Sequence, residues 1–248
     1  MQELTKSILI VSLFLCSYLF YHFKIPLRNL LLFINFIFFG MYLGYFVSIV
    51  HIYYLLKLNF SILMSSISFF IFLLLAFFSH LFWGRFFCGW ICPFGIISWY
   101  LKKIRDFFKM SLSFLQGRFI FLFYFKILFL AIGIFLISKG NYSMVELEPF
   151  FKYSKFPPSF LKKVWFFILL ILNFFIPYFW CRYLCFTGAF FKILSYFSLT
   201  KYIFKCKNKD CKICIQKCPK GIITLEKNII QSECIRCLEC HKCELSQK

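Results

Sequence analysis

Residues 85–95 read RFFCGWICPFG, and residues 178–188 nearly repeat them as YFWCRYLCFTG. Each copy places two cysteines four residues apart, with a glycine three residues after the second cysteine. Both copies follow a long apolar run. A cysteine pair repeated at the ends of two apolar segments suggests that the two copies act together.

The composition around these motifs is that of a membrane protein. The 248 residues are 62% hydrophobic, whereas soluble domains are about 45–50% apolar. A net charge of +20 would suggest a nucleic-acid partner in a soluble domain. In so apolar a chain, basic loops on the cytoplasmic side of a membrane explain it better, and we expect no nucleic-acid partner.

The apolar runs predict a mainly α membrane protein with about five transmembrane helices. Runs of about 20 residues can cross a bilayer, and such runs lie at 7–23, 28–56, 60–83, 118–138 and 161–180. The second run is too long for one untilted span, so we expect it to tilt or to end at the interface. The first run has no small-residue cleavage site after it and is interpreted as a retained anchor.

Loop charge predicts the orientation of these spans. Segments 22–28, 84–118 and 181–248 would share one side of the membrane, and they carry most of the 29 basic residues. The positive-inside rule then places the C-terminus in the cytoplasm and the N-terminus outside. We expect a multi-pass protein of a bacterial-type inner (cytoplasmic) membrane, with residues 188–204 forming a helix along its cytoplasmic surface.

This topology brings the two cysteine motifs to one face, because two spans separate them. A four-residue spacing at a helix end places both thiols of a pair near each other. We therefore hypothesise one shared redox or metal site, formed by Cys88, Cys92, Cys181 and Cys185. The alternative is two reduced pairs that only pack at helix ends.

The strongest motif lies in the tail, residues 205–248, which hold eight of the 13 cysteines. In two-cluster bacterial ferredoxins, a run of three cysteines binds one cluster and the other run supplies the fourth ligand. On that pattern, one [4Fe–4S] cluster would be bound by Cys234, Cys237, Cys240 and Cys218. Zinc is the competing interpretation of paired cysteines, but the interlocking third cysteine of each run favours clusters.

The second set of tail cysteines is less regular. Four residues, instead of two, separate Cys206 from Cys211, and Glu244 follows Cys243 where proline is usual. We expect a second [4Fe–4S] cluster, with the iron held by Cys206, Cys211, Cys214 and Cys243, and a [3Fe–4S] form stays open. The chain thus divides into a transmembrane domain, 1–204, and a small α+β ferredoxin-like two-cluster domain, 205–248.

Two haem-binding interpretations compete with these patterns. Residues 237–241 match the C-x-x-C-H haem-attachment motif, but they lie within evenly spaced cysteines on the predicted cytoplasmic side, so we expect no covalent haem. His51 and His80 would lie near opposite leaflets and cannot share one iron, so both are interpreted as packing or interfacial residues. Cys16 has no partner in the sequence and is interpreted as a lipid-facing or packing residue.

The motifs together resemble a known family. GRFFCGWICPFG, CRYLCFTGA and the cysteine-rich tail are similar to the NapH-like and NosR-like membrane polyferredoxins over about residues 84–248. The family's Cys-x3-Cys-Pro motif falls on Cys88, Cys92 and Pro93, and in the second copy Phe186 replaces the proline.

The resemblance implies an electron carrier without substrate turnover of its own. It would pass electrons between a quinol or cytoplasmic donor and a membrane or respiratory partner. The sequence itself shows no dinucleotide fingerprint, no phosphate loop and no paired carboxylates within the spans. The alternative function is an accessory factor that supplies electrons or metal for the maturation of a partner enzyme.

Overall fold

The computed structural model describes residues 2–23, 27–57, 66–108, 120–142, 145, 147–148, 160–200, 218–222 and 230–239. All regular secondary structure within these ranges is helical, and they contain no strand. The prediction of a mainly helical chain is therefore confirmed. Most of the expected α+β tail domain lies outside the described residues, and its described part forms one 3-10 turn.

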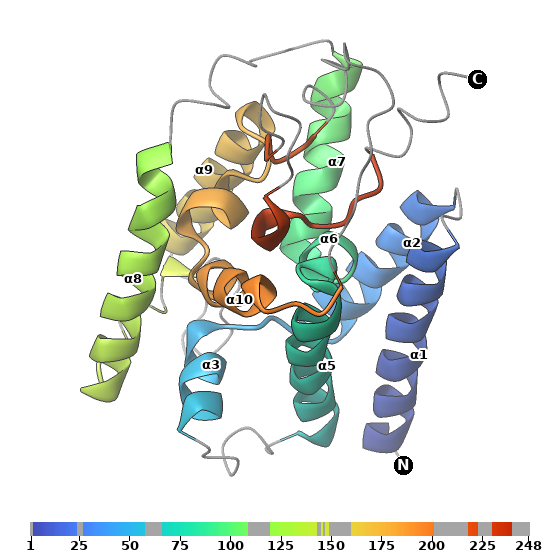
Figure 1. The fold of residues 1–248 in the computed structure, drawn as a ribbon, viewed down its shortest axis with the longest axis horizontal. Helices are drawn as coiled ribbons and strands as arrows, with labels where there is room; N and C mark the ends of the chain where they lie inside the picture. The colour runs from blue at the N-terminus through green and yellow to red at the C-terminus, as the bar shows by residue number, and fades with distance from the viewer. Residues whose placement is uncertain are drawn as a thin grey trace.

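The helices surround two central elements, α6 and α10 (Figure 1). The long and medium helices are α1 (Gln2–His22), α2 (Arg28–Asn35), α3 (Ile49–Leu56), α5 (Ile67–Trp83), α7 (Pro93–Phe107), α8 (Ile120–Ser138), α9 (Phe160–Phe175) and α10 (Phe186–Tyr196). The shorter elements are α6 (Phe86–Trp90), the π-helical turns η1 (Phe36–Tyr42) and η4 (Trp180–Leu184), and the 3-10 turn η5 (Gln231–Glu233).

Four of the five expected apolar runs contain one main helix each, namely α1, α5, α8 and α9. The run at 28–56 differs, because it is broken into α2, η1 and α3. Gly44 follows η1 with a φ of 62°, a conformation that glycine adopts without the steric penalty of a Cβ atom. The chain then re-enters a helix after Ser48, whose hydroxyl accepts the backbone N–H of Val50. Residues 28–56 therefore do not form a single tilted span.

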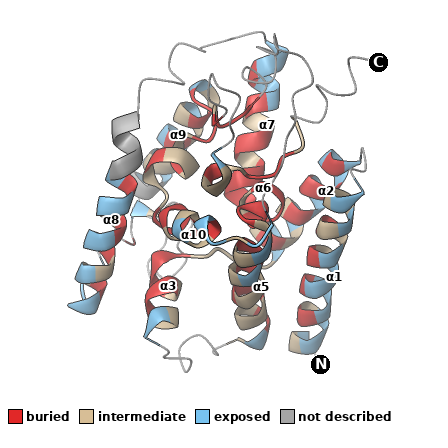
Figure 2. Ribbon diagram, in the orientation of Figure 1, coloured by how far each residue is buried: buried red, intermediate tan, exposed pale blue. Residues whose placement is uncertain are grey.

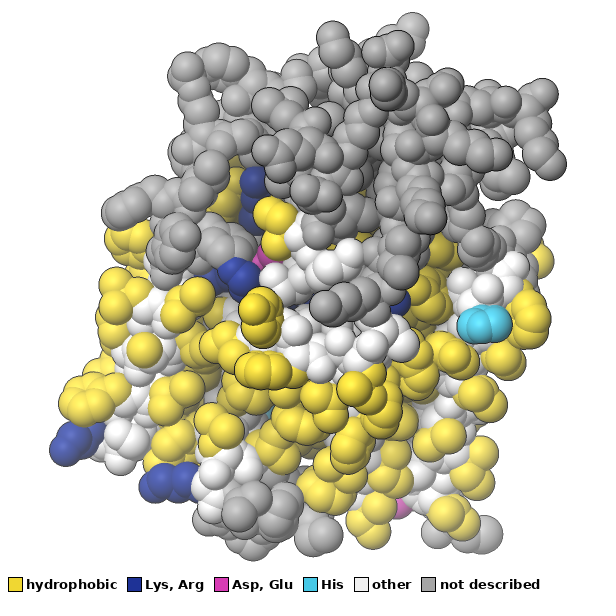
Figure 3. All heavy atoms as spheres, viewed as in Figure 1, with side chains coloured by type: hydrophobic (Ala, Val, Ile, Leu, Met, Phe, Trp, Pro, Cys, Tyr) yellow, Lys and Arg dark blue, Asp and Glu magenta, His cyan; other side chains and the backbone are white. Residues whose placement is uncertain are grey.

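By length and composition, α1 alone among the described helices is able to cross a membrane, with 21 residues and a mean hydropathy of 1.7. Shorter apolar helices occupy Arg28–Tyr42, Ile67–Trp83, Phe125–Ser138 and Lys163–Phe175. Large apolar side chains are exposed on the outer faces of α1, α8 and α9, among them Leu15, Phe135 and Phe167. Figure 3 shows hydrophobic side chains gathered over much of one face of the molecule.

Helix α10 packs against α3, α5, α8 and η5. Its first half is buried through Phe186, Ala189 and Phe191, and Figure 2 shows buried residues concentrated around the centre of the molecule. The helix expected within 188–204 is therefore present, but its first half lies in the interior. The prediction that it lies along a surface is wrong for that half.

Candidate functional site

Both cysteine motifs form the same local structure. In each copy the first cysteine lies in a short helical turn, and the second takes the N-cap position of the following helix. The turn cysteines are Cys88 in α6 and Cys181 in η4, and the capping cysteines are Cys92 before α7 and Cys185 before α10. Proline suits the first position of α7 because that residue needs no N–H donor, and α10 begins without it.

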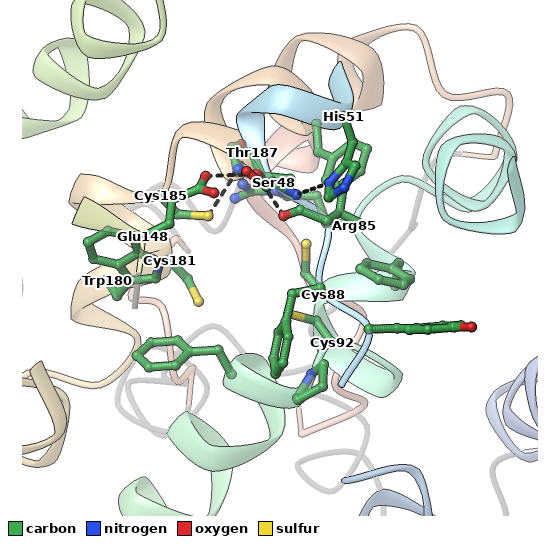
Figure 4. Close-up of a pocket in the computed structure, with 18 of the residues that line it drawn as sticks. Ser48, His51, Arg85, Cys88, Cys92, Glu148, Trp180, Cys181, Cys185 and Thr187 are labelled. Carbon is green, nitrogen blue, oxygen red and sulfur yellow. Dashed lines mark hydrogen bonds between the residues drawn. The ribbon is translucent and has the colours of Figure 1, made fainter. Parts of the chain in front are cut away.

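The four motif cysteines line a single cavity of about 450 Å³. Figure 4 shows Cys181 and Cys185 on one side and Cys88 and Cys92 on the other. Aromatic side chains supply much of the remaining wall, including Phe94. The structure thus brings together the four residues that the sequence placed in one site, while their role as ligands stays a prediction.

The donor set fits a group larger than a single ion. Within the described ranges, no three His, Cys, Asp or Glu side chains converge on a point where one metal ion would be held. Two cysteine pairs on opposite walls of a cavity instead suit a group with several metal atoms. Four cysteine thiolates are the usual ligands of [4Fe–4S] clusters.

Hydrogen-bonding groups lie against two of these sulfurs. The backbone N–H of Gly188 donates to Cys185 Sγ at 3.1 Å. His80 Nδ1 lies 2.6 Å from the carbonyl oxygen of Ala76, and its Nε2 lies 3.5 Å from Cys88 Sγ. With the proton on Nδ1, Nε2 is left to accept from the Cys88 thiol. His80, interpreted from the sequence as a packing residue, is thus also a neighbour of a motif cysteine.

The tail is packed directly onto the first motif. A Cβ atom at Gly89 would lie 2.1 Å from the carbonyl oxygen of Ile235, so only glycine permits this approach. The indole N–H of Trp90 donates to the carbonyl oxygen of Arg236 at 3.1 Å. The loop that begins at Cys234 therefore rests on the short turn that carries Cys88.

We expect Gly89→Ala to displace the tail loop from this turn. A contact of 2.1 Å against backbone cannot be relieved by rotation of a side chain, so the loop itself must move. Limited proteolysis should cut the tail faster in the variant than in the wild type. Gly133→Ala is the matched control, because its Cβ would meet only the flexible Cδ1 of Ile49, at 2.6 Å. Equal proteolysis of the two variants would contradict this docking.

A buried charge network joins the tail to both motifs, and Glu233 is its only carboxylate among the described residues. Lys126 Nζ lies 2.7 Å and Lys220 Nζ 2.6 Å from the Glu233 carboxylate. Arg85 donates to the same carboxylate and to the carbonyl oxygen of Gly188. The side chains of the three cations and of Glu233 are at most 3% exposed. Arg85 of the first motif is thus tied to the second motif and to the tail.

The electrostatics of Glu233 follow from its neighbours. Burial would raise the pKa of the carboxyl, but Arg85, Lys220 and Lys126 hold it well below the ordinary value. Burial also lowers the pKa of Lys220, and the nearby guanidinium of Arg85 adds to this effect. Three buried cations around one carboxylate leave a surplus of positive charge within the described part of the chain. Such a surplus suits neighbouring anionic groups such as thiolates.

Three of the predicted tail ligands are described. Cys218 and Cys237 are buried and Cys234 is half-buried. Burial raises the pKa of both the Cys234 and the Cys237 thiols, and the backbone amides of Arg236 and Glu239, respectively, oppose this rise.

Burial and its charged neighbours set the acidity of the Cys237 thiol. Burial raises the pKa of its thiol to about 12; Arg28 opposes the rise, while Cys218 and Cys234 add to it. Because a metal binds the thiolate, loading this site has to release protons. The remaining predicted tail ligands lie outside the described residues, namely Cys206, Cys211, Cys214, Cys240 and Cys243.

Sequence reasoning missed several residues of this region. The charge network, Arg85, Lys126, Lys220 and Glu233, was absent from the expected site. One signal was available: Lys126 lies within an apolar run, and a charged residue in such a run usually has a buried partner. No sequence signal named Glu233 as that partner, because 107 positions separate the two residues.

The chain is similar to known proteins over the same regions. Residues 65–115 and 158–205, which contain the two motifs, match a family described as a 4Fe-4S binding domain. Uncharacterized protein MJ0750 of Methanocaldococcus jannaschii is 34% identical over 167 residues, which cover 63% of this chain and 67% of that protein. No solved structure matches the chain.

Two longer relatives carry more specific names. Regulatory protein NosR of Stutzerimonas stutzeri is 31% identical over 173 residues, which cover 65% of this chain and 24% of that protein. Protein NirI of Paracoccus denitrificans is 32% identical over 177 residues, covering 64% of this chain and 25% of that protein. The chain thus spans about a quarter of the length of these two relatives.

Proposed function

Because the chain belongs to the family of 4Fe-4S binding polyferredoxins related to NosR and NirI, we propose that it is a membrane electron-transfer protein. It takes electrons from a quinol or a cytoplasmic donor and passes them to a membrane or respiratory partner. Two [4Fe–4S] clusters are held by the tail, and a third group of the same kind is held in the cavity. One-electron exchange is the chemistry that these groups supply when bound.

The observation that carries this proposal is the shared cavity of the four motif cysteines. Ile235, which lies between tail ligands Cys234 and Cys237, also lines that cavity. Cys237 belongs to a buried cluster against which Cys88 and Cys181 pack. Side chains in direct contact thus connect the cavity to the tail ligands. A relay between two redox groups requires such close packing.

Membrane placement is supported by the exposed apolar faces of α1, α8 and α9. We propose that the remaining apolar helices cross or enter the bilayer beside α1, giving about five spans. The excess of basic residues in 181–248 and 84–118 favours a cytoplasmic tail and an outer N-terminus. A quinol, which is soluble in the bilayer, and a cytoplasmic redox protein are then both within reach of the protein.

Metal analysis of a cysteine variant tests this function. Purified anaerobically, the double variant Cys181→Ser and Cys185→Ser should contain about four iron atoms fewer per chain than the wild type, since a [4Fe–4S] group has lost half its ligands. The tail signals should persist in electron paramagnetic resonance. The control is Cys16→Ser, because Cys16 packs among apolar residues of α1 and its neighbours. If the double variant contained as much iron as the wild type, the cavity would hold no iron–sulfur group and would not lie on the electron path.

The accessory role stays a second proposal, and the name of one relative favours it, since NosR is described as a regulatory protein. Stopped-flow reduction by a quinol analogue separates the two. Reduction as fast as respiratory turnover supports the carrier. Slow reduction, together with a deletion phenotype limited to the missing cofactor of one partner enzyme, supports the accessory factor.

A further inference from the structure

One of the tyrosines that line the cysteine cavity is fully buried, and its hydroxyl has no hydrogen-bond partner among the described residues. Tyr178 is 0% exposed and is one of the residues that line the cavity. Its hydroxyl has no partner among the described residues. Because burying an unpaired hydroxyl is costly, a phenylalanine would be the cheaper residue here unless the hydroxyl meets a group that fills the cavity.

The backbone at this position is also unfavourable for a side chain. Tyr178 has a φ of 59°, in the left-handed region that residues with a Cβ atom seldom occupy. Its carbonyl oxygen accepts the N–H of Arg182 at 2.8 Å, which ties it to the turn that carries Cys181. Strained conformations of this kind concentrate at functional sites. A glycine would relieve the backbone, and the chain has a tyrosine instead.

Tyr178 belongs to a buried cluster that contacts both sets of cysteines. Tyr178 packs in one buried cluster with Ile235 and Cys237 of the tail, and Cys88 and Cys181 lie against the same cluster. One side chain therefore touches the surroundings of the tail ligands and those of the cavity ligands. No other tyrosine among the described residues combines this cluster with the wall of the cavity.

We propose that the Tyr178 hydroxyl donates a hydrogen bond to a sulfur of the iron–sulfur group in the cavity, and that its ring separates this group from Cys237. The proposal rests on the proposed function, because it needs a group held by the cavity cysteines. Hydrogen bonds to sulfur are one of the factors that set cluster potentials. A donor stabilises the reduced state more than the oxidised state, since the reduced group carries one more negative charge. Tyr178 thus raises the midpoint potential of the cavity group.

Redox titration of Tyr178→Phe tests this role. The midpoint potential of the cavity group should become more negative, while that of the tail groups moves less and the iron content is unchanged. Hydrogen–deuterium exchange should also remove one proton coupling from the cavity signal in electron–nuclear double resonance of the wild type, and the variant should lack that coupling from the start. Tyr100→Phe is the control, because the Tyr100 hydroxyl donates to the carbonyl oxygen of Asn29 at 2.7 Å.

A second substitution tests the same role in case the Tyr178→Phe variant does not fold. Incorporating 3-fluorotyrosine at position 178 keeps the ring and makes the hydroxyl a stronger donor, so the potential should shift in the positive direction. A wild-type protein with no more iron than the Cys181→Ser and Cys185→Ser variant would overturn both the proposed function and this inference. A cavity signal that is present, but whose potential neither substitution moves, would overturn the inference alone.

Discussion

Replacing Cys237 with serine is expected to remove one tail cluster and to weaken the signal of the other. Cys237 is the central cysteine of its run and is buried at 7% exposure, so no solvent ligand can reach its position easily. The two tail loops are expected to exchange ligands, so loss of one cluster loosens the other. Iron should fall by at least about four atoms per chain, and one reduced-cluster resonance should vanish.

Cys16→Ser is the control for this experiment. Cys16 is half-buried in α1 and packs against an apolar cluster, so its replacement should leave both resonances intact. A result in which Cys16→Ser removes a resonance and Cys237→Ser removes none would show that the ligand assignment is wrong. Zinc in place of iron after strictly anaerobic preparation would instead support a zinc ribbon.

The largest loss of stability is expected for Glu233→Gln. The substitution leaves Arg85, Lys126 and Lys220 buried around a neutral amide. Removing one partner from a buried ion pair costs about 3–5 kcal/mol, because the remaining charge is left without compensation. The unfolding midpoint in detergent should fall clearly, and the tail should be cut more readily by protease.

Two further variants show whether charge is the cause. Adding Lys126→Met to Glu233→Gln should restore part of the lost stability, because one of the uncompensated cations is then removed. Asp106→Asn is the matched control: its carboxylate pairs with Lys102 at 2.6 Å but is 45% exposed, and exposed pairs contribute about 0–1 kcal/mol. Similar losses for Glu233→Gln and Asp106→Asn would mean that the buried network is not a stabilising unit.

The local chemistry of this protein was predictable from the sequence. Apolar runs separated by basic segments led to the helices α1, α5, α8 and α9, because helix formation in an apolar segment depends on nearby residues. The repeated spacing of Cys88–Cys92 and Cys181–Cys185 led to a shared site, and the structure places all four residues around one cavity. The spacing of residues within a motif is a local property of the sequence, and it is the same in the folded protein.

Only the tertiary structure decided how these pieces meet. The buried position of α10 and the contact of Ile235 with Gly89 both depend on residues far apart in the chain. The same holds for Glu233, whose partners Arg85 and Lys126 lie 148 and 107 positions away. The sequence shows that Lys126 needs a counter-charge, and it gives the identity of residue 178 but not its surroundings. Packing decides which carboxylate pairs with the lysine and that Tyr178 lines a cavity of cysteines. The reason is that burial removes water as the alternative partner of every polar group.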